Sequence, residues 1–165
     1  MSDQYAGTTP EHPRVRRAVR VVMIDPDDRF LLMRFVEGGD TWWGTIGGGI
    51  ESGETDQDAA RREVREETGL AEPQIGPCIW LRDHTFPFRG GWLRQVERIY
   101  VARTPAFDAV CADPETEGGC FGGLRWWTVP ELETTTDAIS PTRLAELARG
   151  LLRDGPPPEP VDVGI

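Results

Sequence analysis

Three glutamates, Glu63, Glu66 and Glu67, follow shortly after a run of three glycines at 47–49. On a helix, residues at i, i+3 and i+4 share one face, so the three carboxylates are expected side by side. Carboxylate oxygens next to glycine backbone, which a ligand can approach closely, suit a hard divalent cation such as Mg²⁺. The pattern indicates a metal site; the alternative is a solvated helix face neutralised by neighbouring arginines.

The helix that carries these glutamates has sequence signals at both ends. Thr55 is a favourable N-cap, and Asp58 follows three residues later, as in a capping box. Gly69 is placed to end the helix in a left-handed conformation, and Leu70 can make the hydrophobic contact that follows. Alanines and Val64 give the helix a narrow apolar stripe. We therefore predict a helix between Thr55 and Gly69.

Strands are expected on both sides of this helix. Runs rich in apolar and β-branched residues, separated by turn sequences, predict them. They span residues 16–25, 29–36, 74–88, 92–103 and 124–129. Residues 41–50 form a short apolar stretch that leads into the glycines. In the strand 92–103, the apolar residues that alternate with polar ones are Leu93, Val96, Ile99 and Val101.

The second half of the chain adds a long loop and a second helix. Residues 104–123 are rich in glycine and proline, and a loop of this length is often functional. Residues 140–155 predict a helix, with Ser140 as the N-cap and Pro141 at the first helical position. Leucines at 144, 147 and 151 would line one face of this helix. Proline-rich sequence then ends it.

Composition narrows the class of protein. The chain has 165 residues, which suits one domain with a sizeable core. Its net charge of -10 argues against binding nucleic acid or an anionic membrane through long-range attraction. It has no apolar run long enough to span a membrane and no secretory signal at its start. Three cysteines without CxxC spacing favour reduced thiols and a cytoplasmic location.

The stretch 48–70 resembles the Nudix box, the signature of hydrolases that act on nucleoside diphosphates linked to another group. The positions that match are Gly48, Glu54, Arg62, Glu63, Val64, Glu66, Glu67, Gly69 and Leu70. Nine defined positions over 23 residues make a very specific signal, although the box covers only about a seventh of the chain. One position departs from the family pattern: Ile46 stands where proline is common before the glycines. Proline would stiffen the entry to the loop.

The resemblance implies an α/β fold, an α/β/α sandwich with a mixed β-sheet between helices. We divide the chain into an N-terminal extension (1–14), a single Nudix-type domain (15–155) and a proline-rich tail (156–165). Members of the family that the sequence resembles are often homodimers, so a homodimer is one expected form of this protein. The tail could then pack on the partner. The expected ligand is a small nucleotide rather than a nucleic acid or a membrane.

The resemblance assigns roles within the box. Glu63, Glu66 and Glu67 would bind Mg²⁺ or Mn²⁺, joined by the Gly48 carbonyl. Glu54 and Arg62 would form a salt bridge that holds the loop against the helix, and Gly69 would end the helix. The reaction is attack of water on a phosphorus of a diphosphate, with Glu67 or Glu66 as the candidate base.

Residues outside the box are candidates for substrate binding. Trp43 could stack on a base or pack in the core. Arg34 and Arg98 could each reach a phosphate or remain solvated on the surface. Glu117, in the long loop, could act as a base or a further metal ligand. The candidate substrates that the resemblance implies are ADP-ribose-like nucleotide sugars, nucleoside triphosphates and dinucleoside polyphosphates.

Two other functions compete with the hydrolase. A non-catalytic nucleotide-sensing module would need a damaged box or an attached effector domain, and the box here is intact. An isomerase acting on a prenyl diphosphate would need a catalytic cysteine, and no cysteine is obviously placed for that role.

Overall fold

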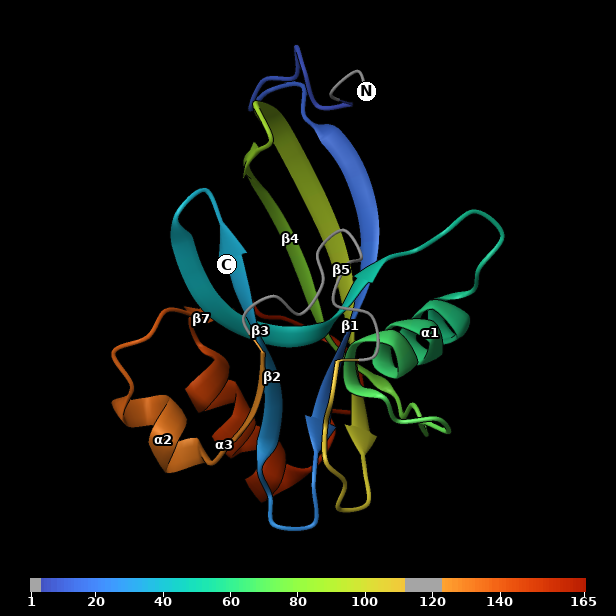
Figure 1. The fold of residues 1–165 in the computed structure, drawn as a ribbon, viewed down its shortest axis with the longest axis vertical. Coiled ribbons are helices and arrows are strands. Elements are labelled where there is room, and N and C mark those ends of the chain that lie inside the picture. The colour runs from blue at the N-terminus through green and yellow to red at the C-terminus, as the bar shows by residue number, and fades with distance from the viewer. Residues whose placement is uncertain (1–3, 112–122) are drawn as a thin grey trace.

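The computed structural model describes residues 4–111 and 123–165, and within them one mixed sheet lies between helices (Figure 1). The strands are β1 (Arg14–Ile24), β2 (Phe30–Glu37), β3 (Asp40–Gly49), β4 (Cys78–Phe88), β5 (Gly91–Arg103), β6 (Leu124–Trp127), β7 (Ile139–Ser140) and β8 (Val161–Asp162). The helices are α1 (Asp56–Thr68), α2 (Val129–Thr134) and α3 (Leu144–Asp154).

The order of strands in the sheet is β6-β2-β3-β1-β5-β4-β8, and β7 pairs with β3. β1 runs parallel to β5 but antiparallel to β3, so the sheet is mixed, as predicted. The register places Arg20 of β1 opposite Gly47 of β3 and opposite Ile99 of β5. This register brings the glycines of the box, on β3, beside β1 at the centre of the sheet.

Two hydrophobic clusters fill the two faces of the sheet. One packs against α3 through Leu144, Ala148 and Leu151. The other packs against α1, where the predicted apolar stripe of Ala59, Ala60 and Val64 is fully buried. Figure 1 shows α1 on one side of the sheet and α2 and α3 on the other. The expected α/β/α sandwich is therefore confirmed.

The side chains of Trp126 and Trp127, which are consecutive on β6, divide between the two clusters because neighbouring residues of a strand face opposite sides. Trp127 is buried on the α3 side and Trp126 packs on the α1 side.

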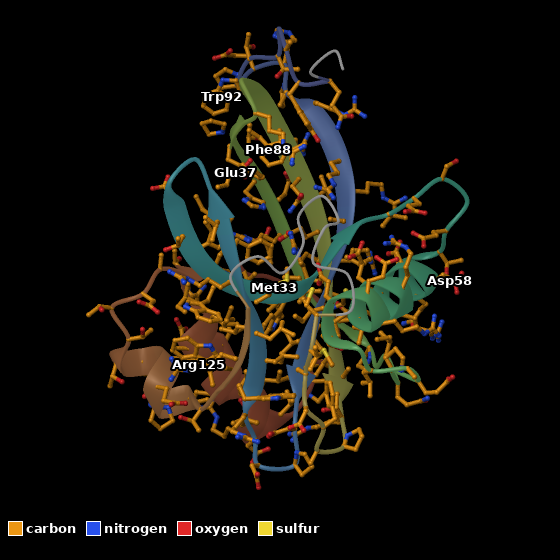
Figure 2. All side chains as sticks on the ribbon, in the orientation of Figure 1. Met33, Glu37, Asp58, Phe88, Trp92 and Arg125 are labelled. Carbon is orange, nitrogen blue, oxygen red and sulfur yellow. The ribbon has the colours of Figure 1, made fainter. Side chains whose placement is uncertain are left out.

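Figure 2 shows Met33 near the middle of the molecule, where it belongs to the α1-side cluster. Phe88 and Trp92 lie at the far end of the β4–β5 hairpin.

The structure adds two elements to the predicted ones and corrects the start of a third. The stretch 41–50 is largely strand β3, because its backbone pairs with β1 and β2 despite the glycines. The last long helix begins at Leu144, since Ser140 is taken into β7 beside Gly44 and so does not cap a helix. The short helix α2 was not predicted, although Thr128 and Glu131 form a complete capping box at its start.

The alternation in β5 also differs from the prediction. Leu93, Ile99 and Val101 are buried, but Gln95 and Glu97 occupy the inward positions between them. Val96 faces the other side and is only partly buried. Two polar residues therefore lie where the apolar pattern alone would place the core.

The two terminal segments pack on the same sheet. Tyr5 is 5% exposed, and its ring meets that of Phe88 edge-on at 5.0 Å. Near the other end, β8 pairs with β4, and Val163 is buried against the α3-side cluster. The tail that could have packed on a partner thus adds a strand to its own domain.

Cysteine chemistry differs in part from the expectation. Cys78 is a free cysteine, but Cys111 is disulfide-bonded, so the prediction of reduced thiols is wrong for Cys111.

Among the described residues, no helix has the length and apolar character needed to cross a membrane.

Candidate active site

Helix α1 begins and ends at the predicted residues. The Thr55 side chain accepts a hydrogen bond from the Asp58 amide at 3.1 Å, and the Thr55 hydroxyl donates to the Asp58 carboxylate at 2.7 Å. Gly69 has φ 77°, and its amide donates to the Arg65 carbonyl. These caps fix the ends of the helix and hence the direction in which its glutamates point.

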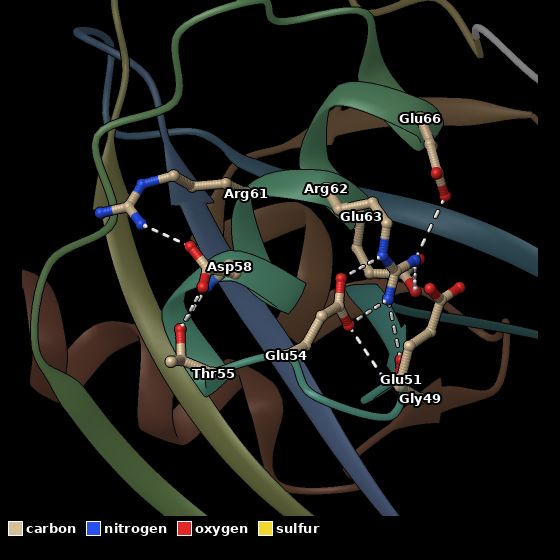
Figure 3. Close-up of polar contacts among 9 residues, drawn as sticks. All are labelled: Gly49, Glu51, Glu54, Thr55, Asp58, Arg61, Arg62, Glu63 and Glu66. Carbon is tan, nitrogen blue, oxygen red and sulfur yellow. Dashed lines mark hydrogen bonds and ion pairs between the residues drawn. The ribbon is translucent and has the colours of Figure 1, made fainter.

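Arg62 joins the loop to the helix (Figure 3). Its Nε and Nη2 donate to the two oxygens of Glu54 at 2.7 and 3.0 Å, and Nη2 also donates to the Gly49 carbonyl at 3.0 Å. Nη1 donates to Glu63 at 2.7 Å and lies 3.4 Å from Glu66. These hydrogen bonds lower the pKa of Glu54 and raise that of Arg62. The geometry is a bidentate Arg–carboxylate pair, which fixes orientation as well as distance.

Glu63 fills the space that Gly48 leaves free. A Cβ on Gly48 would lie 2.5 Å from Oε1 of Glu63, so only glycine fits at this position without displacing the carboxylate. The Glu63 side chain is 12% exposed, and burial raises its pKa even though Arg62 opposes the shift. Glu66 is more open, with 40% of its side chain exposed.

Glu67 is the most buried carboxylate of the box. It is 6% exposed, and its Oε2 accepts a hydrogen bond from the Gly47 amide at 2.9 Å. Burial, followed by the nearby charge of Glu63, raises the pKa of Glu67 to about 8. A buried carboxylate with a raised pKa beside a second one favours binding of a positive charge, which would stabilise both ionised forms.

The donor set suits a divalent cation, although the side chains are not yet gathered around one point. In the described part of the chain, no three acidic, histidine or cysteine side chains converge closely enough to hold a metal ion as they stand. Glu63 is turned toward Arg62, and Glu67 toward Gly47. The oxygen-only chemistry of the set, and the space at Gly48 that a Cβ would fill, fit Mg²⁺ or Mn²⁺.

Two substrate-binding candidates lie on the β2–β3 ladder. Arg34 and Trp43 are cross-strand neighbours, and Arg34 is exposed. The Trp43 indole donates to Asp137 at 3.0 Å, and its ring meets that of Trp127 edge-on at 5.3 Å. Trp43 therefore packs at the margin of the α3-side core, whereas Glu63 and Gly48 lie on the α1 side.

The remaining two candidates do not join the box carboxylates either. The Arg98 guanidinium lies 3.2 Å from Asp56, at the first residue of α1 and away from Glu66 and Glu67 in its second half. Glu117 lies outside the described residues. Of the predicted site residues, the structure therefore brings together those of the box.

Arg20 and Glu97 also reach the site, and the sequence analysis did not identify them. Arg20 donates to the Gly47 carbonyl at 3.0 Å and to Glu97 at 2.9 Å. The signal that could have indicated Glu97 is its position, because it has the same parity as the buried Leu93 and Ile99 on β5. A charged residue at an inward position is seldom buried without a partner.

Comparison with known proteins agrees with the sequence motif. A family model described as the NUDIX domain matches residues 14–149. The nucleoside triphosphatase NudI of Enterobacter sp. (strain 638) is 34% identical over 114 residues, which cover 67% of this chain and 77% of that protein. NudI of Escherichia coli O139:H28 is 30% identical over 143 residues, which cover 83% of this chain and 99% of that protein.

Solved structures share the fold at lower identity. The MutT NUDIX hydrolase from Burkholderia pseudomallei has a TM-score of 0.61 at 23% identity, covering 80% of this chain and 95% of that one. The NUDIX domain of Shewanella oneidensis NrtR, solved with ADP ribose, has a TM-score of 0.62 at 19% identity, covering 92% and 93%. From the box, the fold and the family match together, this chain belongs to the Nudix hydrolases and is an enzyme of the diphosphohydrolase type.

Proposed function

We propose that this enzyme hydrolyses the diphosphate linkage of nucleoside triphosphates, with Mg²⁺ or Mn²⁺ held by Glu63, Glu66, Glu67 and the Gly48 carbonyl. The observation that carries the proposal is the buried Glu67 carboxylate beside Glu63 and the bare backbone of Gly48. Nucleoside triphosphates are preferred to ADP-ribose because the relatives at 30% identity or more are named nucleoside triphosphatases. The neighbour solved with ADP ribose supports the fold alone.

Each box residue has a separate task in this proposal. A bound cation would neutralise phosphate oxygens and lower the pKa of the attacking water. Glu67, which accepts from the Gly47 amide, and Glu63, which packs against Gly48, would supply carboxylate oxygens to that cation. Glu66 is the most exposed of the three and is the better placed to accept the proton of the water. Arg62 holds the loop in place and takes no part in the chemistry.

The test is a panel of nucleoside triphosphates and ADP-ribose, incubated with Mg²⁺ or Mn²⁺ and analysed by product mass. We expect the wild type to cleave triphosphates, and Glu66→Gln and Glu67→Gln each to lower kcat at least about a hundredfold, the scale of a lost acid or base. Both variants should also weaken Mn²⁺ binding, Glu67→Gln the more strongly because Glu67 is the more buried of the two carboxylates. Glu72→Gln, an exposed acid beyond the helix, is the matched control and should behave as wild type.

Two results would contradict the proposal. Cleavage of ADP-ribose but of no triphosphate would contradict nucleoside triphosphates as the substrate class, and would still agree with hydrolysis of a diphosphate linkage. Tight nucleotide binding without any cleavage, with either cation, would instead favour the non-catalytic sensing module.

A further inference from the structure

A row of charged side chains crosses three neighbouring strands on the face of the sheet opposite α1. Arg20 lies on β1 opposite Ile99 of β5, and Glu97 lies two residues before Ile99 on the same face. Arg82 of β4 is the cross-strand partner of Glu97. Ile99 belongs to the α3-side cluster, so the row continues the buried face of the sheet beyond that core.

Glu97 is the centre of this row and is held from several sides. It is 2% exposed and accepts hydrogen bonds from Arg20 at 2.9 Å and from Gln95 at 2.6 Å. Arg82 lies 3.4 Å from its second oxygen. Burial alone would raise the pKa of Glu97, but the two guanidinium groups keep it below its usual range. Glu97 is therefore an ionised, buried anchor for Arg20.

Arg20 extends from this anchor to the entry of the box. Its Nε faces Glu97, while its Nη1 donates to the Gly47 carbonyl at 3.0 Å. The amide of the same glycine donates to Glu67 at 2.9 Å. Gly47 has φ +142°, and a Cβ there would lie 2.1 Å from the Val19 carbonyl oxygen. Arg20 thus holds the carbonyl of Gly47, and Glu67 holds its amide.

We propose that Arg20, anchored by Glu97, is a positioning residue that fixes the Gly47 backbone and, through its amide, the orientation of the Glu67 carboxylate. This inference rests on the proposed function of the box as the catalytic site. It also accounts for Ile46, which lacks the stiffness of the proline common at this position in the family. The planar fork of an arginine can satisfy two acceptors in fixed directions, and the single ammonium of a lysine cannot.

The test compares Arg20→Lys with Arg82→Lys. Both variants keep a positive charge beside Glu97, but only Arg20 contacts Gly47. We expect Arg20→Lys to lower kcat by about tenfold or more, with little change in KM, because a small misplacement of a reacting group costs rate. Arg82→Lys is expected to keep the wild-type kcat. Thermal unfolding of both variants separates these effects from loss of the fold.

A second readout does not depend on activity. Hydrogen exchange of the Gly47 amide, followed by NMR, should be faster in Arg20→Lys and unchanged in Arg82→Lys. If the wild type cleaves no substrate, the proposed function fails. The exchange rate of the Gly47 amide still tests whether Arg20 fixes the Gly47 backbone. The inference would be overturned if kcat decreased equally in Arg20→Lys and Arg82→Lys and the unfolding temperature decreased with it in both. Unchanged Gly47 exchange in Arg20→Lys would overturn it as well.

Discussion

Two arginines organise the site from opposite sides, and they differ in where their partners come from. Arg62 binds Glu54 and Gly49, which lie within 13 residues of it in the sequence. Arg20 binds Glu97, which is 77 residues away and 2% exposed. The cluster around Arg62 is built by a helix and the loop before it, whereas the cluster around Arg20 exists only once three strands have taken their register.

The two clusters meet at the glycine loop. Arg62 holds the Gly49 carbonyl, Arg20 holds the Gly47 carbonyl, and Glu67 accepts from the Gly47 amide. Gly48, the residue between the two carbonyls, provides the space for Glu63. A change at one cluster should therefore disturb the site through the loop, and a change in the loop should disturb both.

Gly47→Ala breaks both clusters and should have the largest effect. The new methyl group would meet the Val19 carbonyl oxygen at 2.1 Å, in a backbone conformation that favours glycine. We expect a loss of about 3 kcal/mol or more in the free energy of unfolding, and loss of hydrolysis. Denaturant unfolding and kcat measure the two effects.

Gly150→Ala is the control for the loss of a glycine. Gly150 lies in α3, and a Cβ there would meet nothing within 4 Å. Alanine should stabilise the protein by about 0.5–1 kcal/mol, because glycine is unfavourable within a helix. A Gly47→Ala variant as stable and active as Gly150→Ala would contradict the account of the loop.

The pH dependence of stability tests the buried carboxylates of the α1 side. Folding raises the pKa of Glu67 from 4.5 to about 8, so the folded state holds this proton more tightly than the unfolded state. The associated stability is present below about pH 4.5 and is lost as the pH rises toward 8, at about 1.4 kcal/mol per pKa unit at most. Metal-free protein should therefore be less stable at pH 8 than at pH 5.

Unfolding of wild type and Glu67→Gln at both pH values, with EDTA or Mg²⁺, measures this effect. The loss should be smaller in Glu67→Gln, and Mg²⁺ should restore stability at pH 8 in the wild type. The same pH dependence of stability in the metal-free wild type and in metal-free Glu67→Gln would contradict the raised pKa of Glu67.

Arg62→Lys breaks the α1-side cluster alone. Lysine cannot reproduce the bidentate contact with Glu54 together with those to Gly49 and Glu63. We expect a loss of about 2 kcal/mol in the free energy of unfolding, on the scale of lost charge-assisted hydrogen bonds. Arg61→Lys is the control, because Arg61 forms a 3.6 Å ion pair with the exposed Asp58 that a lysine can replace. The two variants unfolding alike would contradict the role of Arg62.

His84 gives a smaller test on the other side of the sheet. Burial, followed by the charge of Arg82, lowers the pKa of His84 to about 4. The associated stability is present above about pH 6.5 and is lost as the pH falls toward 4, which predicts a loss of about 1–2 kcal/mol between pH 7 and pH 5. His84→Gln should reduce this loss, whereas the exposed His12→Gln should not. A dependence of the free energy of unfolding on pH that is identical in the two variants would contradict a partly buried, neutral His84.

The sequence predicted the parts of the site that depend on local spacing. The helix caps at Thr55 and Gly69 follow from residues a few positions apart, and the nearby contact between Arg62 and Glu54 was implied by the resemblance to the Nudix box. The turn between the predicted strands 16–25 and 29–36 is also local, because Asp25 accepts a hydrogen bond from the Arg29 amide at 2.8 Å. Such interactions form whenever the local chain takes its preferred conformation.

What the sequence missed depends on pairing between distant strands. Glu97 was counted among the polar residues of β5, and its burial follows only from the register that places it beside Arg20 and Arg82. Arg98 was a phosphate candidate, but the packing of α1 on the sheet gives it Asp56 as a partner. Ser140 resembled a helix cap until pairing with β3 placed it in a strand.

The most direct test of the central claim is the binding of Mn²⁺, measured by electron paramagnetic resonance in the wild type and in the double variant Glu63→Gln, Glu67→Gln. The claim is that the buried Glu67 and the partly buried Glu63 hold the catalytic cation next to the glycine loop. The account predicts Mn²⁺ binding by the wild type, weakened by about tenfold or more when both charges are removed. Equal Mn²⁺ affinity in the two proteins would contradict it.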